Sequence, residues 1–210
     1  MSEDTVDGWW FGVRDADGEV RESHGERRIV RPGETLRYHG TPEVCWRGMH
    51  ASPDPLLALR AAPEWATVVH RVRLSGVIVA GVGPQDGKYA AQARTVLWSA
   101  DAEPTLRRVA VDYAERALLA ERAAGREPDA RYWAAVEYGR AHARGEIDAH
   151  ALGAVRALPL AEWWATAPVA AGAAVAAGAA VAAGAAGREG QRRHLEAALW
   201  ALGPAGEGSA

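Results

Sequence analysis

The chain has 210 residues, of which 49% are hydrophobic, and a formal net charge of −3. This length suits one domain or two small ones with an apolar core, and the weak negative charge argues against a nucleic-acid partner. The single cysteine, Cys45, excludes an internal disulfide, and with an acidic N-terminus that lacks an apolar run it favours a reducing, cytoplasmic location.

The first strands are expected close to the N-terminus. Trp9 to Val13 is short and aromatic, as strands often are, and turn residues follow it. A second strand is expected at 34–39 and a third, shorter one at Val44 to Trp46. A proline then opens a short predicted helix at 55–60.

The clearest strand pattern lies in the middle of the chain. Thr67 to Leu74 alternates apolar and other residues, which predicts a half-buried strand. Ser75-Gly76 after it is typical of a tight turn, so residues 77–82 are expected to return as the second strand of a β-hairpin. Residues 83–87 then form a loop on turn chemistry alone.

From residue 101 onward the pattern becomes helical. Apolar residues recur at three- and four-residue spacing from Leu106 to Ala117, which predicts an amphipathic helix. Further helices are expected at 132–142, at 148–158 and from Arg188 onward. We therefore predict a β-rich module with one short helix at 1–100, a helical region at 101–202 and a disordered tail at 203–210.

The helical region contains three copies of the hexad Val-Ala-Ala-Gly-Ala-Ala within residues 169–187. A membrane-spanning helix and a coil of left-handed β-helix are both possible interpretations. Alanine and glycine gain little from lipid, however, and three hexads make too few coils to stack. A packed alanine helix is preferred, enclosed by neighbouring helices or by another subunit, because it has no polar side.

These elements predict an α+β protein: a small, mostly antiparallel β module followed by an alanine-rich helical half. The all-round apolar tract predicts a protein partner or self-association through the helical half, without a membrane. The interleaved arginines and acids of that half are typical of a solvated, salt-bridged surface.

A cluster of chemically versatile residues follows the second predicted strand: His39, Cys45 and His50. Imidazole and thiolate groups are zinc ligands, but no closely spaced pair supports a metal site, and we predict none. Cys45 beside histidines also suits a nucleophile, although a lone cysteine next to Trp46 is more often buried.

A glycine-containing loop at residues 81–88 ends in Lys88, the only lysine of the chain. A phosphate-binding P-loop needs glycine where Val82 stands and serine or threonine where Tyr89 stands. We therefore expect an ordinary connecting loop rather than a nucleotide-binding motif.

The segments His39-Gly40-Thr41 and Gly48 to Ser52 resemble elements with which ADP-ribosyltransferases and RNA 2′-phosphotransferases hold NAD or phosphate. This resemblance implies an NAD-dependent transferase with a catalytic glutamate. The spacing argues against it, because those folds place a helix between the two strands. Glu64 and Glu103 are the candidate glutamates, and neither stands in a recognisable motif.

A second resemblance runs from about residue 32 to residue 101. Its elements, in chain order, are Cys45, Gly48-Met49-His50-Ala51-Ser52, Pro55-Leu56-Leu57-Ala58-Leu59, Arg73-Leu74-Ser75-Gly76, Asp86-Gly87-Lys88 and Arg94-Thr95-Val96-Leu97-Trp98. In this order they resemble an uncharacterised family of bacteriophage and actinobacterial proteins that often carry an alanine-rich helical tail. The resemblance implies no known activity, cofactor or partner.

Together the two resemblances select the candidate ligand-binding residues: His39, Cys45, His50, Ser52, Asp86 and Lys88. The sequence favours a non-enzymatic accessory or interaction protein of phage or prophage type, with the binding site in the β module. The NAD-dependent or phosphoryl-transfer enzyme is the alternative.

Overall fold

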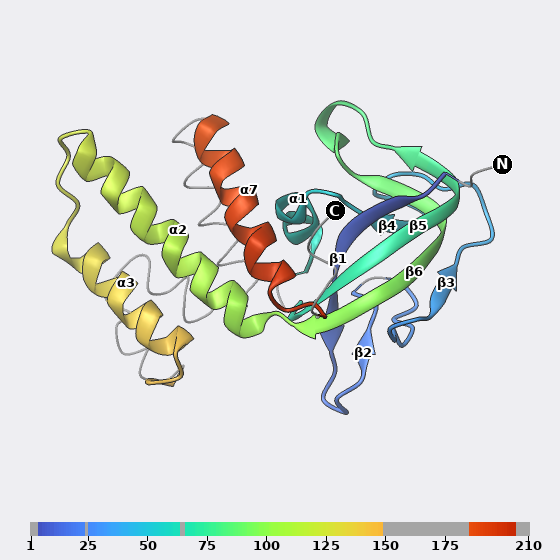
Figure 1. Cartoon of the computed structure of the whole chain (residues 1–210), viewed down its shortest axis with the longest axis horizontal. Helices are drawn as coiled ribbons and strands as arrows, with labels where there is room; N and C mark the ends of the chain where they lie inside the picture. Colours follow the sequence, from blue (N-terminus) through green and yellow to red (C-terminus); the bar gives the residue numbers. More distant parts are fainter. Residues whose placement is uncertain (1–3, 24, 64–65, 149–184, 205–210) are drawn as a thin grey trace. The chain divides into compact units, whose positions relative to one another are not determined.

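A computed structural model describes residues 4–23, 25–63, 66–148 and 185–204. The chain divides into two compact units. The first comprises residues 1–62, 66–101 and 199–210, and the second comprises residues 63–65 and 102–198. The predicted α+β class is confirmed, because an antiparallel sheet fills the N-terminal half and helices fill the described C-terminal half (Figure 1).

Six strands form the sheet of the first unit, in the order β2-β1-β5-β6-β3, with β4 also paired to β6. Every pairing is antiparallel. The strands are β1 (Val6–Arg14), β2 (Val20–Arg21), β3 (Thr35–Arg37), β4 (Met49–Ala51), β5 (Val68–Ala80) and β6 (Tyr89–Asp101). The strands expected at Trp9 to Val13 and within 34–39 are thus confirmed as β1 and β3.

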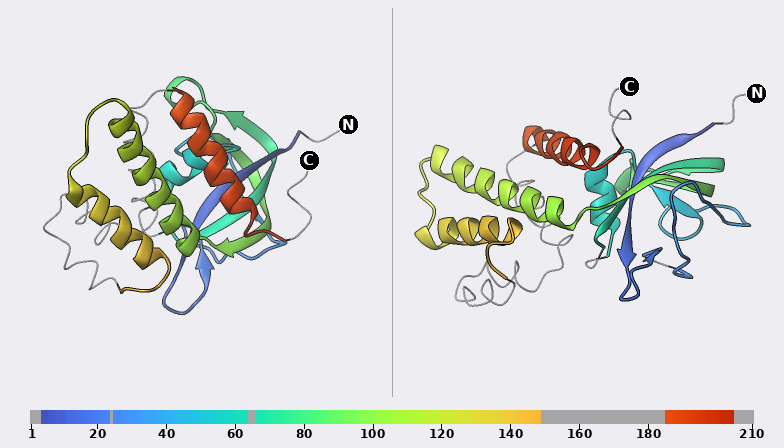
Figure 2. Two further views of the ribbon diagram at one scale, coloured as in Figure 1. Left: turned by 60° about the vertical axis from the view of Figure 1, so that its left-hand side comes forward. Right: turned by 60° about the horizontal axis from the view of Figure 1, so that its bottom comes forward.

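The sheet curls so that its two sides approach each other. The residue after β4, Ser52, exchanges backbone hydrogen bonds of 2.7 and 3.1 Å with Trp9 of β1. Two bulges in β5, at Arg71/Val72 and at Ser75/Ile78, bend the long strands and permit this closure. The bend of β1, β5 and β6 is visible in Figure 2.

The second of these bulges corrects a prediction. Ser75-Gly76 does not turn the chain back; β5 continues through it to Ala80, and β6 returns only after the loop at 81–88. Gly76 has φ +79°, a conformation that glycine adopts freely and that serves a bulge as well as a turn. The prediction of a hairpin turn at Ser75-Gly76 is therefore wrong. The hairpin is formed by β5 and β6, and its connection is the loop at 81–88.

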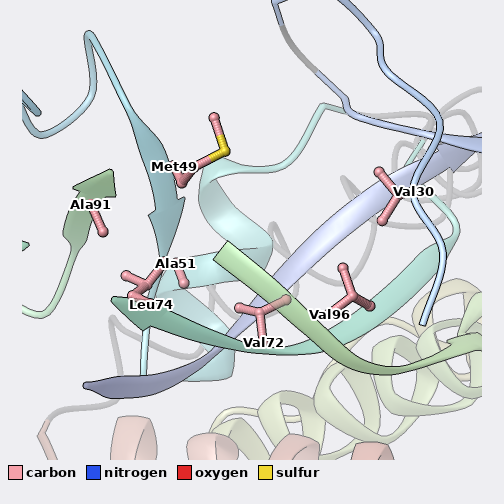
Figure 3. Packing of buried hydrophobic residues seen from close by; sticks show 7 residues of the cluster. All are labelled: Val30, Met49, Ala51, Val72, Leu74, Ala91 and Val96. Atoms are coloured by element: carbon pink, nitrogen blue, oxygen red, sulfur yellow. The ribbon is translucent and has the colours of Figure 1, made fainter. Parts of the chain in front are cut away.

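The main hydrophobic cluster of this unit lies between the curled strands. Figure 3 shows Val72 and Leu74 of β5 gathered with residues of β4 and β6. The cluster consists of Val30, Met49, Ala51, Val72, Leu74, Ala91 and Val96, all at most 7% exposed. Val72 and Leu74 are two positions apart, as are Met49 and Ala51, so each pair points to one face of the sheet.

A cluster of tryptophans forms a second apolar centre of the first unit. Trp200 lies with its ring centroid 5.1 Å from that of Trp9 and 6.0 Å from that of Trp98. The guanidinium of Arg71 lies 5.0 Å from the ring centroids of both Trp9 and Trp200, within cation–π range. The last residue of helix α7 (Ala185–Trp200) thus takes part in the packing of the β module.

Two short helical elements border the sheet. Helix α1 (Pro55–Ala61) begins after Asp54, whose carboxylate accepts a hydrogen bond from the Leu56 amide, and it contributes Leu56 and Leu59 to the core. The 3-10 turn η1 (Gly83–Gln85) lies in the loop between β5 and β6. The helix expected at 55–60 is confirmed.

Three helices make up the described part of the second unit: α2 (Glu103–Ala123), α3 (Ala130–Ala143) and α7 (Ala185–Trp200), whose last two residues belong to the first unit. Helices α2 and α3 lie side by side over Val111, Leu118 and Val136 (Figure 2). On α7, the Gln191 carbonyl accepts a 2.6 Å bond from the Tyr113 hydroxyl.

The predicted helix at 148–158 and the hexad tract at 169–187 lie almost wholly outside the described residues. Within the described ranges, no helix combines the length and the apolar character needed to cross a membrane.

Candidate functional site

A cavity of about 770 Å³ opens in the first unit. It is bounded by the segment after β2, the segment after β3, the turn at 45–48, strand β4, one side of α1 and the start of β6. A hollow of this size accommodates a small-molecule ligand. The cavity therefore gathers stretches that are far apart in the sequence.

Five of the six candidate ligand-binding residues border this cavity. These are His39, Cys45, His50, Ser52 and Lys88. The sixth, Asp86, is exposed at the end of η1 and does not border it. The fold thus brings most of the candidates together, while their role in binding stays a prediction.

Ser52 has a structural task at the edge of the cavity. Its side chain is almost fully buried, and its hydroxyl donates a 2.7 Å hydrogen bond to the carbonyl of Gly87. The same oxygen accepts a 3.1 Å bond from the Asp54 amide. Ser52 therefore fixes the loop before β6 and the start of α1, and its hydroxyl is occupied without a ligand.

Cys45 and Trp46 lie in a tight turn rather than in the short strand expected at Val44 to Trp46. Glu43 and Arg47 pair on either side of the turn, and both Cys45 and Trp46 are exposed. The expected burial of the thiol is therefore wrong. Cys45 has φ +70°, which costs a residue with a side chain on the order of 1 kcal/mol.

His50 holds this strained turn in place. The amide of Cys45 donates a 3.1 Å hydrogen bond to Nε2 of His50, one residue into β4. An Nε2 that accepts this bond leaves the ring proton on Nδ1. His50 is thus a positioning residue for the turn that carries Trp46.

The border of the cavity is rich in positive charge. Among its described residues, five cationic side chains face two carboxylates, and the cations are Arg28, Arg37, Arg47, Lys88 and Arg94. The carboxylates are Glu22 and Glu26. This local excess of cations contrasts with the net charge of −3 of the whole chain.

Three of these cations have no partner within the described residues. The side chains of Arg37, Arg47 and Lys88 form no hydrogen bond, ion pair or cation–π contact there, whereas most arginines of the first unit do. One further described cation of this unit, Arg60, is also unpaired, and it lies outside the cavity border. Unpaired cations around a hollow attract an anion.

The floor of the cavity holds a buried ion pair. Arg94, 2% exposed, donates a 2.9 Å bond to Glu22 and a 3.1 Å bond to the carbonyl of His50. Its guanidinium lies 3.9 Å from the ring centroid of Trp10, and Arg28 donates a 2.7 Å bond to the other oxygen of Glu22. Burial lowers the pKa of Arg94 to about 10, which leaves it charged at neutral pH.

His70 also packs against Trp10. Its ring is fully buried, stacks on Trp10 at 4.7 Å between centroids, and shares a 2.7 Å hydrogen bond with the hydroxyl of Ser99. Burial, assisted by the charge of Arg94, lowers the pKa of His70 to about 3. The ring is therefore neutral at physiological pH and supports Trp10 as a flat packing surface.

His39, Cys45 and His50 share the cavity border without forming a metal centre. Within the described ranges, no group of three or more histidine, cysteine, aspartate or glutamate side chains is arranged to hold a metal ion. His50 already uses Nε2 for the turn. The zinc interpretation therefore gains no support from the geometry.

Arg94, Glu22 and the unpaired arginines were not singled out by their sequence positions. Arg94 stands in the Arg-x-Val-Leu-Trp segment that carries the family resemblance, and this was the one signal available for it. The sequence positions of Arg37 and Arg47 do not distinguish them from ordinary surface arginines. Only the curl of the sheet brings both to the border of one cavity.

Comparisons with protein-family models, with curated proteins and with solved structures gave no match.

Proposed function

We propose that the first unit is a non-enzymatic binding module that takes an anionic ligand in its cavity. The observation that carries this proposal is the set of three unpaired cations, Arg37, Arg47 and Lys88, around one hollow. A phosphate or carboxylate group bound in the cavity can pair with these cations without breaking an existing ion pair. The buried pair of Arg94 and Glu22 beneath them gives the floor a fixed shape.

Calorimetric titration of the full chain with inorganic phosphate tests this function. We expect saturable binding that is weakened about threefold to tenfold by Arg37→Ala, Arg47→Ala or Lys88→Ala, the usual contribution of one charged contact. Arg60→Ala is the matched control, because Arg60 is an unpaired, exposed arginine of the same unit outside the cavity border. Equal weakening by the control, or no binding, would refute the proposal.

A transferase is the second candidate, favoured by one observation: His39, His50 and Glu22 border the same cavity. Against it, both oxygens of Glu22 are held by arginines, Nε2 of His50 binds the Cys45 amide, and His39 follows β3 instead of lying in it. Incubation with NAD discriminates the two functions. Release of nicotinamide by the wild type would favour the enzyme, and its absence would leave the binding module.

Self-association through the second unit is proposed separately. Leu119 on α2 and Tyr138 on α3 are 47% and 44% exposed, so each helix carries a large side chain whose apolar surface a second copy would bury. Sedimentation equilibrium of the wild type and of a Leu119→Glu, Tyr138→Glu variant tests it. A wild type that remains monomeric at high concentration would exclude this association.

A further inference from the structure

Trp46 is 76% exposed and borders the cavity. Within the part of the chain that the structure describes, the only other exposed aromatic side chain is that of Tyr138, at 44%. The turn that carries it is well ordered by backbone bonds: Glu43 and Arg47 exchange two, of 2.8 and 2.9 Å. The Cys45 amide adds the bond to His50. The exposed indole of Trp46 is therefore carried by a turn that contains the strained residue Cys45 and is fixed by a hydrogen bond to His50.

Strained backbone beside an exposed aromatic ring indicates a surface kept for a ligand. A turn without such a task would favour glycine at a position with φ +70° and a polar residue at a position as exposed as Trp46. The indole offers a flat apolar face of the kind that stacks on another ring.

Each unpaired cation of the cavity has an aromatic neighbour in the sequence. Arg37 precedes Tyr38, Arg47 follows Trp46, and Lys88 precedes Tyr89. All three aromatic residues border the cavity together with the cations. The same hollow therefore combines ring surfaces for stacking with charges for an anion, and a ligand that satisfies both has a planar ring joined to an anionic group.

We propose that this ligand is a nucleoside phosphate, with its base against Trp46 and its phosphate among Arg37, Arg47 and Lys88. This inference rests on the anion-binding function proposed above and adds the ring. A volume of about 770 Å³ is adequate for a mononucleotide. A polymer strand is disfavoured because the other described arginines of the first unit, apart from Arg60, are paired or packed on aromatic rings and leave no continuous cationic track.

Three probes separate the contribution of the ring from that of the charge. Calorimetric titrations of the full chain with AMP, adenosine and inorganic phosphate measure both together, the ring alone and the anion alone. We expect AMP to bind at least about tenfold more tightly than either part, since base stacking on an aromatic side chain contributes about fivefold to a hundredfold or more in affinity.

Trp46→Ala is the diagnostic variant. It should reduce the affinity for AMP to about that for inorganic phosphate and leave phosphate binding unchanged, whereas Arg47→Ala should weaken both. Val82→Ala is the control, because Val82 is 79% exposed and lies outside the cavity border. Since Trp46 makes little buried contact, the variant is expected to fold, and its unfolding midpoint in urea verifies this.

His50→Ala tests the turn itself. Loss of the bond to the Cys45 amide should weaken AMP binding while phosphate binding persists, which a general loss of folding would not produce. Equal affinities for AMP and phosphate in the wild type would refute the nucleotide proposal and leave the anion-binding function standing. Absence of binding by all probes would overturn the nucleotide proposal and the anion-binding function. Tighter binding of an oligonucleotide of about eight nucleotides than of AMP would overturn the free nucleotide as ligand and indicate a nucleic-acid strand.

Discussion

Arg94 and Glu22 are charged residues of the cavity border whose ion pair is expected to stabilise the fold. Both are almost fully buried, and they pair at 2.9 Å beneath the cavity. Removing one partner of a buried pair leaves the other charge without compensation, while removing both costs much less.

We therefore expect Arg94→Met to lower the free energy of unfolding by about 3 kcal/mol, even though Arg28 still contacts Glu22. The double variant Glu22→Gln, Arg94→Met should lose less than the sum of the single losses, by about 1–3 kcal/mol. Urea unfolding of the four proteins closes the cycle. Additive losses would show that the two side chains act independently.

His70 makes the stability of the protein depend on pH. Its pKa is about 3 in the folded chain and about 6.5 in an unfolded one, so below pH 6.5 the unfolded state binds a proton that the folded state does not. Its contribution is fully present above the unfolded value. It is lost as the pH falls toward the folded one, at up to about 1.4 kcal/mol per pH unit.

The measurement is the free energy of unfolding at several pH values between about 7.5 and 4. His70→Gln should flatten the curve relative to the wild type, and the two curves should run parallel above pH 7. His39→Gln is the control, since His39 is exposed at the cavity border. Parallel curves over the whole range would mean that His70 has the same pKa in the folded and the unfolded protein.

Among the elements, the bulge of β5 has the clearest backbone requirement. Gly76 has φ +79°, and a Cβ there would lie 3.2 Å from Cβ of Gln92 on β6. Gly76→Ala should lower the free energy of unfolding by about 1–2 kcal/mol from the backbone strain, with a further loss from the contact. Gly33→Ala, at φ +84° with no atom within 4 Å, isolates the strain. A smaller loss at Gly76 than at Gly33 would contradict the tight packing of the bulge.

The same bulge shows where sequence patterns stop being informative about elements. Helices α2 and α3 were predictable because their apolar spacing is a local signal. Gly76 is compatible with a turn and with a bulge, and only its pairing with β6 decides between them. Strand β6 was missed because its alanines favour helices when they are taken alone.

The candidate site follows the same rule. His39, Cys45 and His50 lie within twelve residues, so their proximity was predictable from the sequence. Arg94 and Glu22 are 72 positions apart and meet only because the sheet curls. Asp86 does not border the cavity, because it follows η1 directly and is exposed to solvent.

At the scale of the whole molecule, the course of the chain links the two ends of the sequence. The first unit is interrupted by the helices and resumes at Leu199, where Trp200 contacts Trp9, Trp98 and Arg71. Leu199 is fully buried as well. The β module therefore depends on the last two residues of α7, which follow helices α2 and α3 in the chain.

A chain that ends at residue 198 should consequently be less stable than the full chain by about 3 kcal/mol or more, because it lacks Leu199, which is fully buried, and truncating one buried leucine usually costs about 2–5 kcal/mol. A chain that ends at Pro204 keeps Trp200 and should unfold at the urea concentration of the full chain. Circular dichroism and tryptophan fluorescence follow the transition together. If both truncated chains unfolded alike, the tryptophan cluster would contribute nothing to stability, and the module would be complete by Asp101. If only the shorter chain is destabilised, the C-terminal residues are an integral part of the unit that carries the cavity.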